Sequence, residues 1–313
     1  MSQLAGAQAR VADPILTAVA RGYVSPKSPL ANVLFPVVSV GSRAGRIISF
    51  GPDDFRVVST ARAPGADIKR VQFGYADGTY SLVDHDLEGV LPVEIGEEAA
   101  AVPGIAMGSV TVKKVLNMMG IERENQAAKI ATNASNYDSS NKSTPTNTDK
   151  WDHADSNPAK QIEEAKEVVR SQIGAYPSVL ALSPKAYTAL RNHPKLLDRI
   201  STSTDRSPLN TQQLAALLEV DRVVVGDGVA FDDTTKKFVD LWGKDAVLAY
   251  VQPASLAEMG SPCFGYTYQL GDGATVAEPY FLRGKKSWIY PVSDAYQPVL
   301  AGKSAAFLFK NVV

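Results

Sequence analysis

Residues 103–133 set the strongest limit on the fold of this 313-residue chain, because their apolar positions follow helical spacing over an unusual length. These apolar positions recur at steps of three, four and seven and are Ile105, Val112, Val115, Leu116, Met119, Ala127 and Ile130. A helix of this length extends about 45 Å, well beyond the average globular helix. Gly108 and Gly120 lie inside it and each lowers the helix propensity, so the sequence allows a bend or break near Gly120.

The segments on either side of this helix have different patterns. Residues 34–83 contain short β-branched and aromatic runs separated by turn sequences, which predicts a β-hairpin or meander. Residues 157–251 alternate predicted helices and strands, which is typical of an α/β layer. The tail from about residue 264 returns to strands. Because neither β region is long enough to bury a core alone, distant segments are expected to share one sheet.

Local signals place several element ends. Asp13-Pro14 predicts the start of a short helix, and Asn157-Pro158 predicts another that Gly174 ends. Residues 133–158 form a polar loop in which Trp151 is the candidate anchor.

Composition excludes several classes of protein. The chain has 32 basic and 33 acidic residues, so its net charge of −1 does not predict general attraction to nucleic acid or anionic membranes. The single Cys263 excludes an internal disulfide framework and fits a reducing compartment. No run reaches the roughly 18 apolar residues of a membrane span.

No catalytic or metal-binding constellation is found. The three histidines are distant in sequence and lack metal-ligand spacing. The stretches GDGVAFDD at 226–233 and GDGATVAE at 271–278 lack the spacing of nucleotide-binding loops, and both are interpreted as glycine turns. We therefore expect no enzyme activity, no metal and no cofactor.

Charge order is the feature that ordinary composition does not explain. Residues 42–70 hold six basic residues against three acidic ones, a net charge of +3. Residues 71–112 hold seven acidic residues and no Lys or Arg, a net charge of −7. A basic hairpin is thus followed directly by an acidic segment.

Two arrangements explain this order. The hairpin folds back onto its own acidic segment, or it lies on that of an identical neighbour in a head-to-tail contact. An isolated two-stranded hairpin is only marginally stable in water, so packing on a neighbouring copy would stabilise it. Charges would set the register, while Ile47, Phe50, Phe55 and Val57 would supply apolar area. The predicted contact residues are Arg43, Arg46, Phe50, Phe55, Arg56, Arg62, Lys69, Arg70, Glu94, Glu97 and Glu98.

The order of these segments resembles the major capsid proteins of tailed double-stranded DNA bacteriophages. The resemblance rests on the stretch from LFPVVSVGSRAGRIISF to QFGY, on EEAAAVPGI before the long helix, and on HPKLLDRI, LAALLEVDRVVVGDGV and DLWGKDAVLAYV. It covers nearly the whole chain and implies the α+β fold of the Hong Kong 97 type. By this resemblance the chain divides into an N-terminal arm at 1–41, an extended loop at 42–73, a peripheral domain at 74–156 and 261–313 with its spine helix at 103–134, and an axial domain at 157–260.

The same resemblance implies function and partners. Copies would assemble as hexamers and pentamers into the icosahedral head shell, in the host cytoplasm and without a membrane, around double-stranded DNA held without sequence-specific contact. The extended loop begins about forty residues from Met1, so a separate scaffold protein is expected instead of a long N-terminal scaffolding segment. A portal protein and a decoration protein are the other partners that the family implies.

Two rival functions remain open at this point. An encapsulin-type nanocompartment shares the fold and encloses protein cargo. An α/β enzyme with an unrecognised site in residues 157–251 is the rival of a different class.

Overall fold

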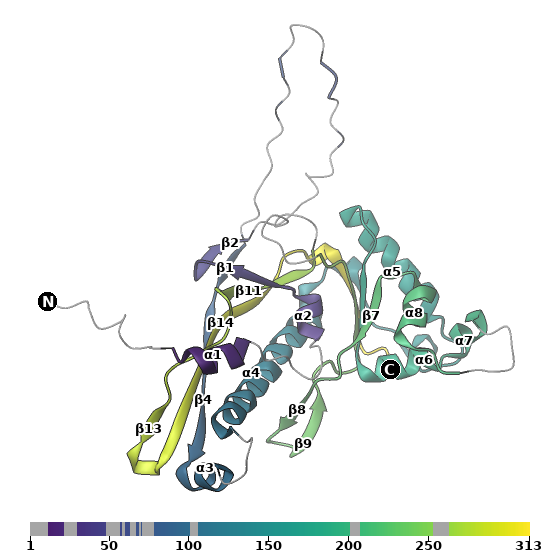
Figure 1. Cartoon of the computed structure of the whole chain (residues 1–313). Helices are drawn as coiled ribbons and strands as arrows, with labels where there is room; N and C mark the ends of the chain where they lie inside the picture. The colour runs from purple at the N-terminus through teal and green to yellow at the C-terminus, as the bar shows by residue number, and fades with distance from the viewer. Residues whose placement is uncertain are drawn as a thin grey trace.

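The computed structural model describes residues 12–21, 30–47, 57, 60–62, 67–68, 70, 78–100, 106–200, 207–252 and 263–313. It is an α+β fold in which an antiparallel-rich sheet crossed by a long helix adjoins a second sheet flanked by helices (Figure 1). No helix within these ranges is both long and apolar enough for a membrane span.

The first sheet is organised around its longest strand. It comprises β1 (Val37–Val40), β4 (Val83–Pro92), β11 (Gly265–Leu270), β12 (Thr275–Val276), β13 (Tyr280–Leu282) and β14 (Ser287–Leu300). β14 pairs antiparallel with β4, β11, β12 and β13, and β1 joins the edge parallel to β11. The prediction that distant segments share a sheet is confirmed.

Helix α4 (Met107–Ala131) covers one face of this sheet with its buried Val112, Val115 and Leu116. The contact is close at Gly89 of β4, where a Cβ atom would lie 2.5 Å from Cγ2 of Thr111. α4 passes through Gly120 without interruption, so the break that its sequence allowed does not occur. A short helix that the sequence analysis missed, α3 (Val93–Ala100), connects β4 to the segment before α4.

The second sheet has the order β5 (Lys142–Ser143), β15 (Ala306–Phe309), β10 (Ala246–Ala249), β6 (Val179–Leu182) and β7 (Arg222–Val225). All residues of β6, β10 and β15 are buried. The accompanying helices are α5 (Pro158–Ile173), α6 (Pro184–Arg191), α7 (Pro194–Ile200) and α8 (Thr211–Leu218). The predicted ends of α5 are confirmed, because Asn157 caps its start and Gly174 is left-handed at φ 69°.

The C-terminal strand β15 belongs to the second sheet. It pairs with β10, and β5 pairs with β15, whereas the family resemblance groups residues 74–156 and 261–313 together as the peripheral domain. Trp151 is the anchor that the sequence predicts: it is fully buried, and its Nε1 donates to Oε1 of Gln161 at 2.7 Å. Short 3-10 turns lie at Ala134–Asn136, Ser139–Asn141, Asn147–Asp149, Arg283–Lys285 and Lys303–Ala305.

Near the N-terminus, α1 (Pro14–Arg21) begins as predicted, with the Asp13 carboxylate accepting hydrogen bonds from the backbone N–H groups of Ile15 and Leu16. The isolated β-bridge between Ala12 and Ala277 brings this end of the chain to the first sheet.

The carboxylate of Glu124, in α4, joins three parts of the chain. It accepts hydrogen bonds from the backbone N–H groups of Leu30 and Ala31, at the start of α2 (Leu30–Leu34), at 3.1 and 3.0 Å. It also accepts one from Nε1 of Trp242 at 2.7 Å, and Trp242 lies just before β10 of the second sheet. Since Glu124 is buried, these bonds fix the arm and the second sheet relative to α4.

Two strand pairs stand apart from the two sheets in the described ranges: β2 (Ala44–Arg46) with β3 (Thr79–Ser81), and β8 (Val229–Asp232) with β9 (Lys237–Asp240). The glycine turn expected at 271–278 is confirmed by left-handed Gly271 and Gly273. The glycine turn expected at 226–233 is wrong, because Gly226 and Gly228 do not have positive φ and Val229–Asp232 form strand β8.

We expect the stability contribution of Glu124 to depend on pH. Burial raises the pKa of its carboxyl group above the usual value, against the opposing effect of the three hydrogen bonds. A raised folded-state pKa means that protonation stabilises the fold, and this stabilisation is lost as pH rises through that pKa. Relative to Glu124→Gln, the free energy of unfolding of the unchanged protein should fall as the pH rises above about 4, the usual range of a glutamate carboxyl group. Urea denaturation at increasing pH measures the difference, and a difference independent of pH would contradict the prediction.

Trp151→Ala should lower the free energy of unfolding by about 3–5 kcal/mol, because it leaves a large cavity and removes the hydrogen bond to Gln161. Met118→Ala is the control, since Met118 is exposed on α4 and its truncation should change stability by less than about 0.5 kcal/mol. Chemical denaturation of the unassembled chain compares the two variants, and equal effects would show that Trp151 is not an anchor.

Candidate subunit interface

The base of the extended segment is held in the core of its own chain. Ile47 is only 5% exposed, and its backbone N–H donates to the carbonyl oxygen of Gly78 at 2.8 Å. Tyr80 of β3 stacks on Tyr268 of β11, with ring centroids 4.4 Å apart. The expectation that Ile47 supplies area to a neighbour is therefore wrong, because its side chain is already buried.

Arg43 forms an ion pair within its own chain. Its Nη1 lies 2.7 and 2.8 Å from the two carboxylate oxygens of Asp84 at the start of β4, and both side chains are about half exposed. This basic residue therefore pairs with the acidic segment of its own chain. Arg46, the other predicted contact residue here, lies exposed on β2.

Farther along the segment, every described side chain is exposed. Val57 is 103% exposed and Ile68 is 75% exposed, and the predicted contact residues Arg62 and Arg70 are also exposed. The predicted contact residues Phe50, Phe55, Arg56 and Lys69 lie outside the described residues. Apolar and basic side chains therefore face solvent on the same segment.

Strand β4 presents carboxylates on the face of the sheet opposite α4. Leu87 and Gly89 face α4, so the alternation of a strand turns Asp84, Asp86 and Glu88 the other way, and all three are exposed. Glu88 also accepts a hydrogen bond from the Tyr280 hydroxyl at 3.1 Å. These carboxylates were counted in the acidic segment but not proposed as contact residues, although their two-residue spacing was a usable signal.

The predicted acidic contact residues Glu94, Glu97 and Glu98 all lie on α3 and are exposed. Their spacing of three and four residues places them on one side of the helix. α3 follows β4 directly, so the two acidic groups are continuous along the chain. The structure thus contains an exposed basic and apolar segment and a separate exposed acidic surface.

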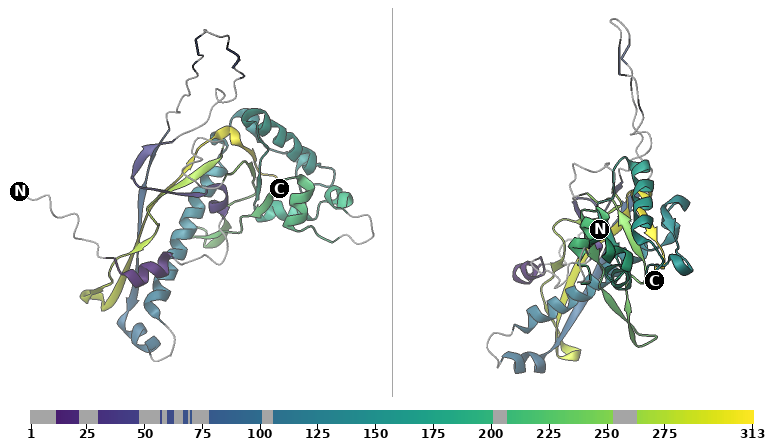
Figure 2. Two further views of the ribbon diagram at one scale, coloured as in Figure 1. Left: turned by 45° about the horizontal axis from the view of Figure 1, so that its top comes forward. Right: turned by 90° about the vertical axis from the view of Figure 1, so that its right-hand side faces the viewer.

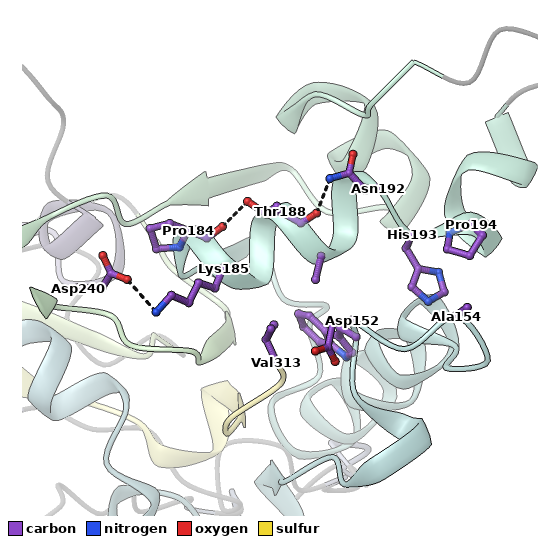
Figure 3. Close-up of a pocket in the computed structure, with 12 residues that line it drawn as sticks. Asp152, Ala154, Pro184, Lys185, Thr188, Asn192, His193, Pro194, Asp240 and Val313 are labelled. Atoms are coloured by element: carbon purple, nitrogen blue, oxygen red, sulfur yellow. Dashed lines mark hydrogen bonds and ion pairs between the residues drawn. The ribbon is translucent and has the colours of Figure 1, made fainter.

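A cavity of about 530 Å³ lies beside α6 and is lined by several polar side chains (Figure 3). His193 lines it, and the Nε2 atom of His193 lies 3.0 Å from Ser156 Oγ and 3.2 Å from the carbonyl oxygen of His153. A carbonyl oxygen only accepts, so Nε2 carries the proton and cannot take one from Ser156. Burial lowers the pKa of His193, and its buried Nδ1 has no hydrogen-bond partner in the described chain.

Other polar groups around this cavity are engaged locally. Lys185 and Asp240 pair at 3.5 Å, and the side chains of Thr188 and Asn192 donate to carbonyl oxygens of α6 (Figure 3). Among the described residues, no group of His, Cys, Asp and Glu side chains could hold a metal ion. The arrangement at the cavity does not match nucleophilic or metal-assisted catalysis.

Comparison with known proteins identifies the family. Residues 113–288 match the profile of the family described as phage major capsid protein E. The chain is 30% identical over 309 residues to the major capsid protein of Burkholderia phage BcepMu, a match that covers 97% of each protein. This chain belongs to the phage major capsid protein family. A second relative, the major capsid protein of Pseudomonas phage JBD67, is 27% identical over 309 residues, covering 96% of this chain and 97% of that protein.

Solved structures agree with this family assignment. The solved structure of a phage-related protein of Bordetella bronchiseptica RB50 superposes on this chain with a TM-score of 0.79. The two are 39% identical, and the match covers 97% of this chain and 98% of that one. The capsid of cyanophage P-SCSP1u gives a TM-score of 0.58 at 11% identity, covering 92% of this chain and 89% of that one, which shows the shared Hong Kong 97-type fold alone.

The capsid protein is therefore a structural subunit of an icosahedral bacteriophage shell built from many copies. Its place is in the virion shell, and its family and fold point to a non-enzymatic role. The encapsulin complex of Synechococcus elongatus PCC 7942 also shares the fold, with a TM-score of 0.54 at 13% identity, covering 94% of each chain. That likeness concerns the fold only, so the encapsulin alternative is weaker.

The Arg43–Asp84 pair should contribute little to stability because water screens both exposed groups. In a double-mutant cycle of Arg43→Ala and Asp84→Ala, we expect a coupling energy of about 0.2–1 kcal/mol that falls as salt is added. Urea denaturation of the four chains measures it. A coupling well above this range, insensitive to salt, would mean that the pair is a structural constraint of the fold.

Proposed function

We propose that the capsid protein assembles as hexamers and pentamers through a head-to-tail contact. In this contact the basic segment of one copy, residues 42–70, lies on the acidic surface of the next copy, which is formed by β4 and α3. The observation that carries the proposal is the exposure of basic Arg70 and apolar Val57 and Ile68 on one segment, and of Glu94, Glu97 and Glu98 on α3, in one nearly neutral chain. A heterologous contact of this kind closes into rings when the rotation between neighbours is suitable.

The two kinds of side chain have different roles in the contact. Val57 is fully exposed and Ile68 is largely exposed, and covering them supplies most of the affinity. The charges set register and speed the encounter, because exposed ion pairs add little net free energy. Phe50 and Phe55 join the apolar group, while Arg46, Arg56 and Lys69 join the basic one.

The proposed division of the chain follows the family. Residues 1–41 are the arm, 42–73 the extended loop, and 74–156 with 261–313 the peripheral domain that carries the spine helix, here α4. Residues 157–260 are the axial domain, to which the pairing of β15 adds the C-terminal strand. The axial domain would meet its copies around five-fold and six-fold axes.

The assembled shell encloses double-stranded DNA and has no catalytic role. A net charge of −1 suits a wall that confines DNA without reading its sequence. Assembly takes place in the host cytoplasm with a scaffold protein and a portal protein, and a decoration protein is a further partner consistent with the family.

Reversing two charges tests the contact. Arg56→Glu with Arg62→Glu should leave the subunit folded, as judged by circular dichroism and thermal unfolding, but block particle formation because like charges then face each other. Adding Glu97→Lys and Glu98→Lys should restore particles, since only paired sites couple in this way. Sedimentation and negative-stain electron microscopy measure the yield of particles.

The matched control adds Glu163→Lys and Glu164→Lys on α5 in place of the changes on α3. This variant has the same net charge and should not restore assembly. Normal particles from the Arg56→Glu, Arg62→Glu variant, or equal rescue by the control, would contradict the proposed contact.

A further inference from the structure

The β8–β9 hairpin projects from the body of the subunit (Figures 1 and 2). One of its faces carries exposed apolar side chains. Phe231 and Phe238 are direct partners across the two strands, with their rings in edge contact at 5.3 Å. Val229 lies on the same face, two residues before Phe231. Phe231 is 51% exposed and Phe238 is 73% exposed, so the aromatic pair is largely in water.

The base of this hairpin is held firmly. The backbone N–H of Leu241 donates to the carbonyl oxygen of Gly228 at 3.0 Å, and Trp242 beside it is buried and hydrogen-bonded to Glu124. At Gly226 a Cβ atom would lie 2.4 Å from the Trp242 ring, which shows how closely the ring packs there. The apolar face is therefore presented by a fixed support.

A two-stranded hairpin with no covering layer is marginally stable in water, and exposed aromatic side chains on such a projection are typical of protein interfaces. In the described chain β8 and β9 pair only with each other. A partner that binds this face must present apolar side chains to it. The partner surface should also be basic, because residues 227–241 hold four acidic and two basic residues, a net charge of −2.

The end of the first sheet has the complementary character. Phe281 of β13 and Trp288 of β14 are direct partners with ring centroids 5.5 Å apart, and they are 41% and 43% exposed. The surrounding residues 278–288 hold one acidic and three basic residues, a net charge of +2, from exposed Glu278, Arg283, Lys285 and Lys286. This end thus offers an aromatic pair with a basic rim.

Both surfaces remain exposed in the single chain, and in Figure 1 they lie on opposite sides of α4. A protein of a shell-forming family provides many identical copies, and a plug on one side with a socket on the other is the geometry of a head-to-tail contact. We propose that the apolar face of β8–β9 docks against the Phe281–Trp288 pair of a second copy, with the acidic Asp233 beside the basic rim.

This contact uses neither the basic segment nor the acidic residues of β4 and α3. It is a second contact between copies, and its failure is distinguishable from failure of the first. An unrelated partner protein on β8–β9, or a different segment of the second copy, is an alternative outcome of the experiments below.

Photocrosslinking in assembled particles of the full-length chain tests the contact directly. Benzoylphenylalanine in place of Phe238 should crosslink to residues 278–288 of another copy, identified by mass spectrometry. The same group in place of exposed Tyr176 is the control and should not reach that segment. Crosslinks from position 238 only to other segments, to its own chain or to another protein would overturn the proposal.

Substitution gives an independent readout. Phe231→Ser with Phe238→Ser should raise the protein concentration needed for assembly by about tenfold or more, corresponding to about 1.4 kcal/mol. Met118→Ser with Ile121→Ser is the matched control, because it removes two exposed apolar side chains from α4, and it should change assembly less than twofold. Circular dichroism and thermal unfolding check that each subunit folds.

Charge reversal separates docking from a folding defect. Asp233 is suitable because it is exposed and forms an exposed ion pair with Lys236 at 3.2 Å, whereas Asp232 accepts hydrogen bonds that shape the turn. Asp233→Lys and Lys285→Glu should each weaken assembly, and together they should restore it. Additive losses, or unchanged assembly in the Phe231→Ser, Phe238→Ser variant, would overturn the proposal.

Discussion

The pairing of β4 with β14 is the interaction on which the rest of the subunit depends. Its register runs from Ser287 opposite Pro92 to Tyr296 opposite Val83, joining segments about two hundred residues apart in sequence. With α4 on one face, this register turns Asp84, Asp86 and Glu88 to the other face. A shift of one residue would place these carboxylates against α4, so the register and the acidic surface are inseparable.

This arrangement leaves the single subunit with acidic and apolar side chains exposed to solvent. Side chains two residues apart on a strand lie about 7 Å from each other, so the carboxylates of β4 repel one another. Arg43 offsets one of them within the chain. In the proposed assembly a neighbouring copy covers the exposed acidic side chains of α3 and the exposed apolar side chains Val57, Ile68, Phe231 and Phe238. Glu124 contributes by holding the arm and the second sheet at fixed positions on α4.

Sequence patterns predicted the features that depend on local chemistry. The caps at Asp13 and Asn157, the end at Gly174 and the anchor Trp151 all follow from residue types near in sequence. The exposed acidic residues of α3 were singled out by charge order, although the helix itself was not predicted, because its glycine and glutamates hid the helical pattern.

What the sequence could not predict depends on long-range pairing. β15 joins β10 because both strands are buried on both faces, and any buried strand would look the same in sequence. β8 and β9 are short and interrupted by charges, so their stretch was interpreted as a turn. The exposure of Phe231, Phe238, Phe281 and Trp288 was likewise invisible, since aromatic residues in strands are normally buried.

The central claim is that the basic segment finds its partner on another copy of the chain. A cryo-electron microscopy reconstruction of the assembled shell, at a resolution that separates side chains, tests it most directly. The account predicts the guanidinium groups of Arg62 and Arg70 within about 4 Å of carboxylates on α3 or β4 of an adjacent subunit. If both groups instead contact acidic residues of their own chain, or lie free in solvent, the account is contradicted.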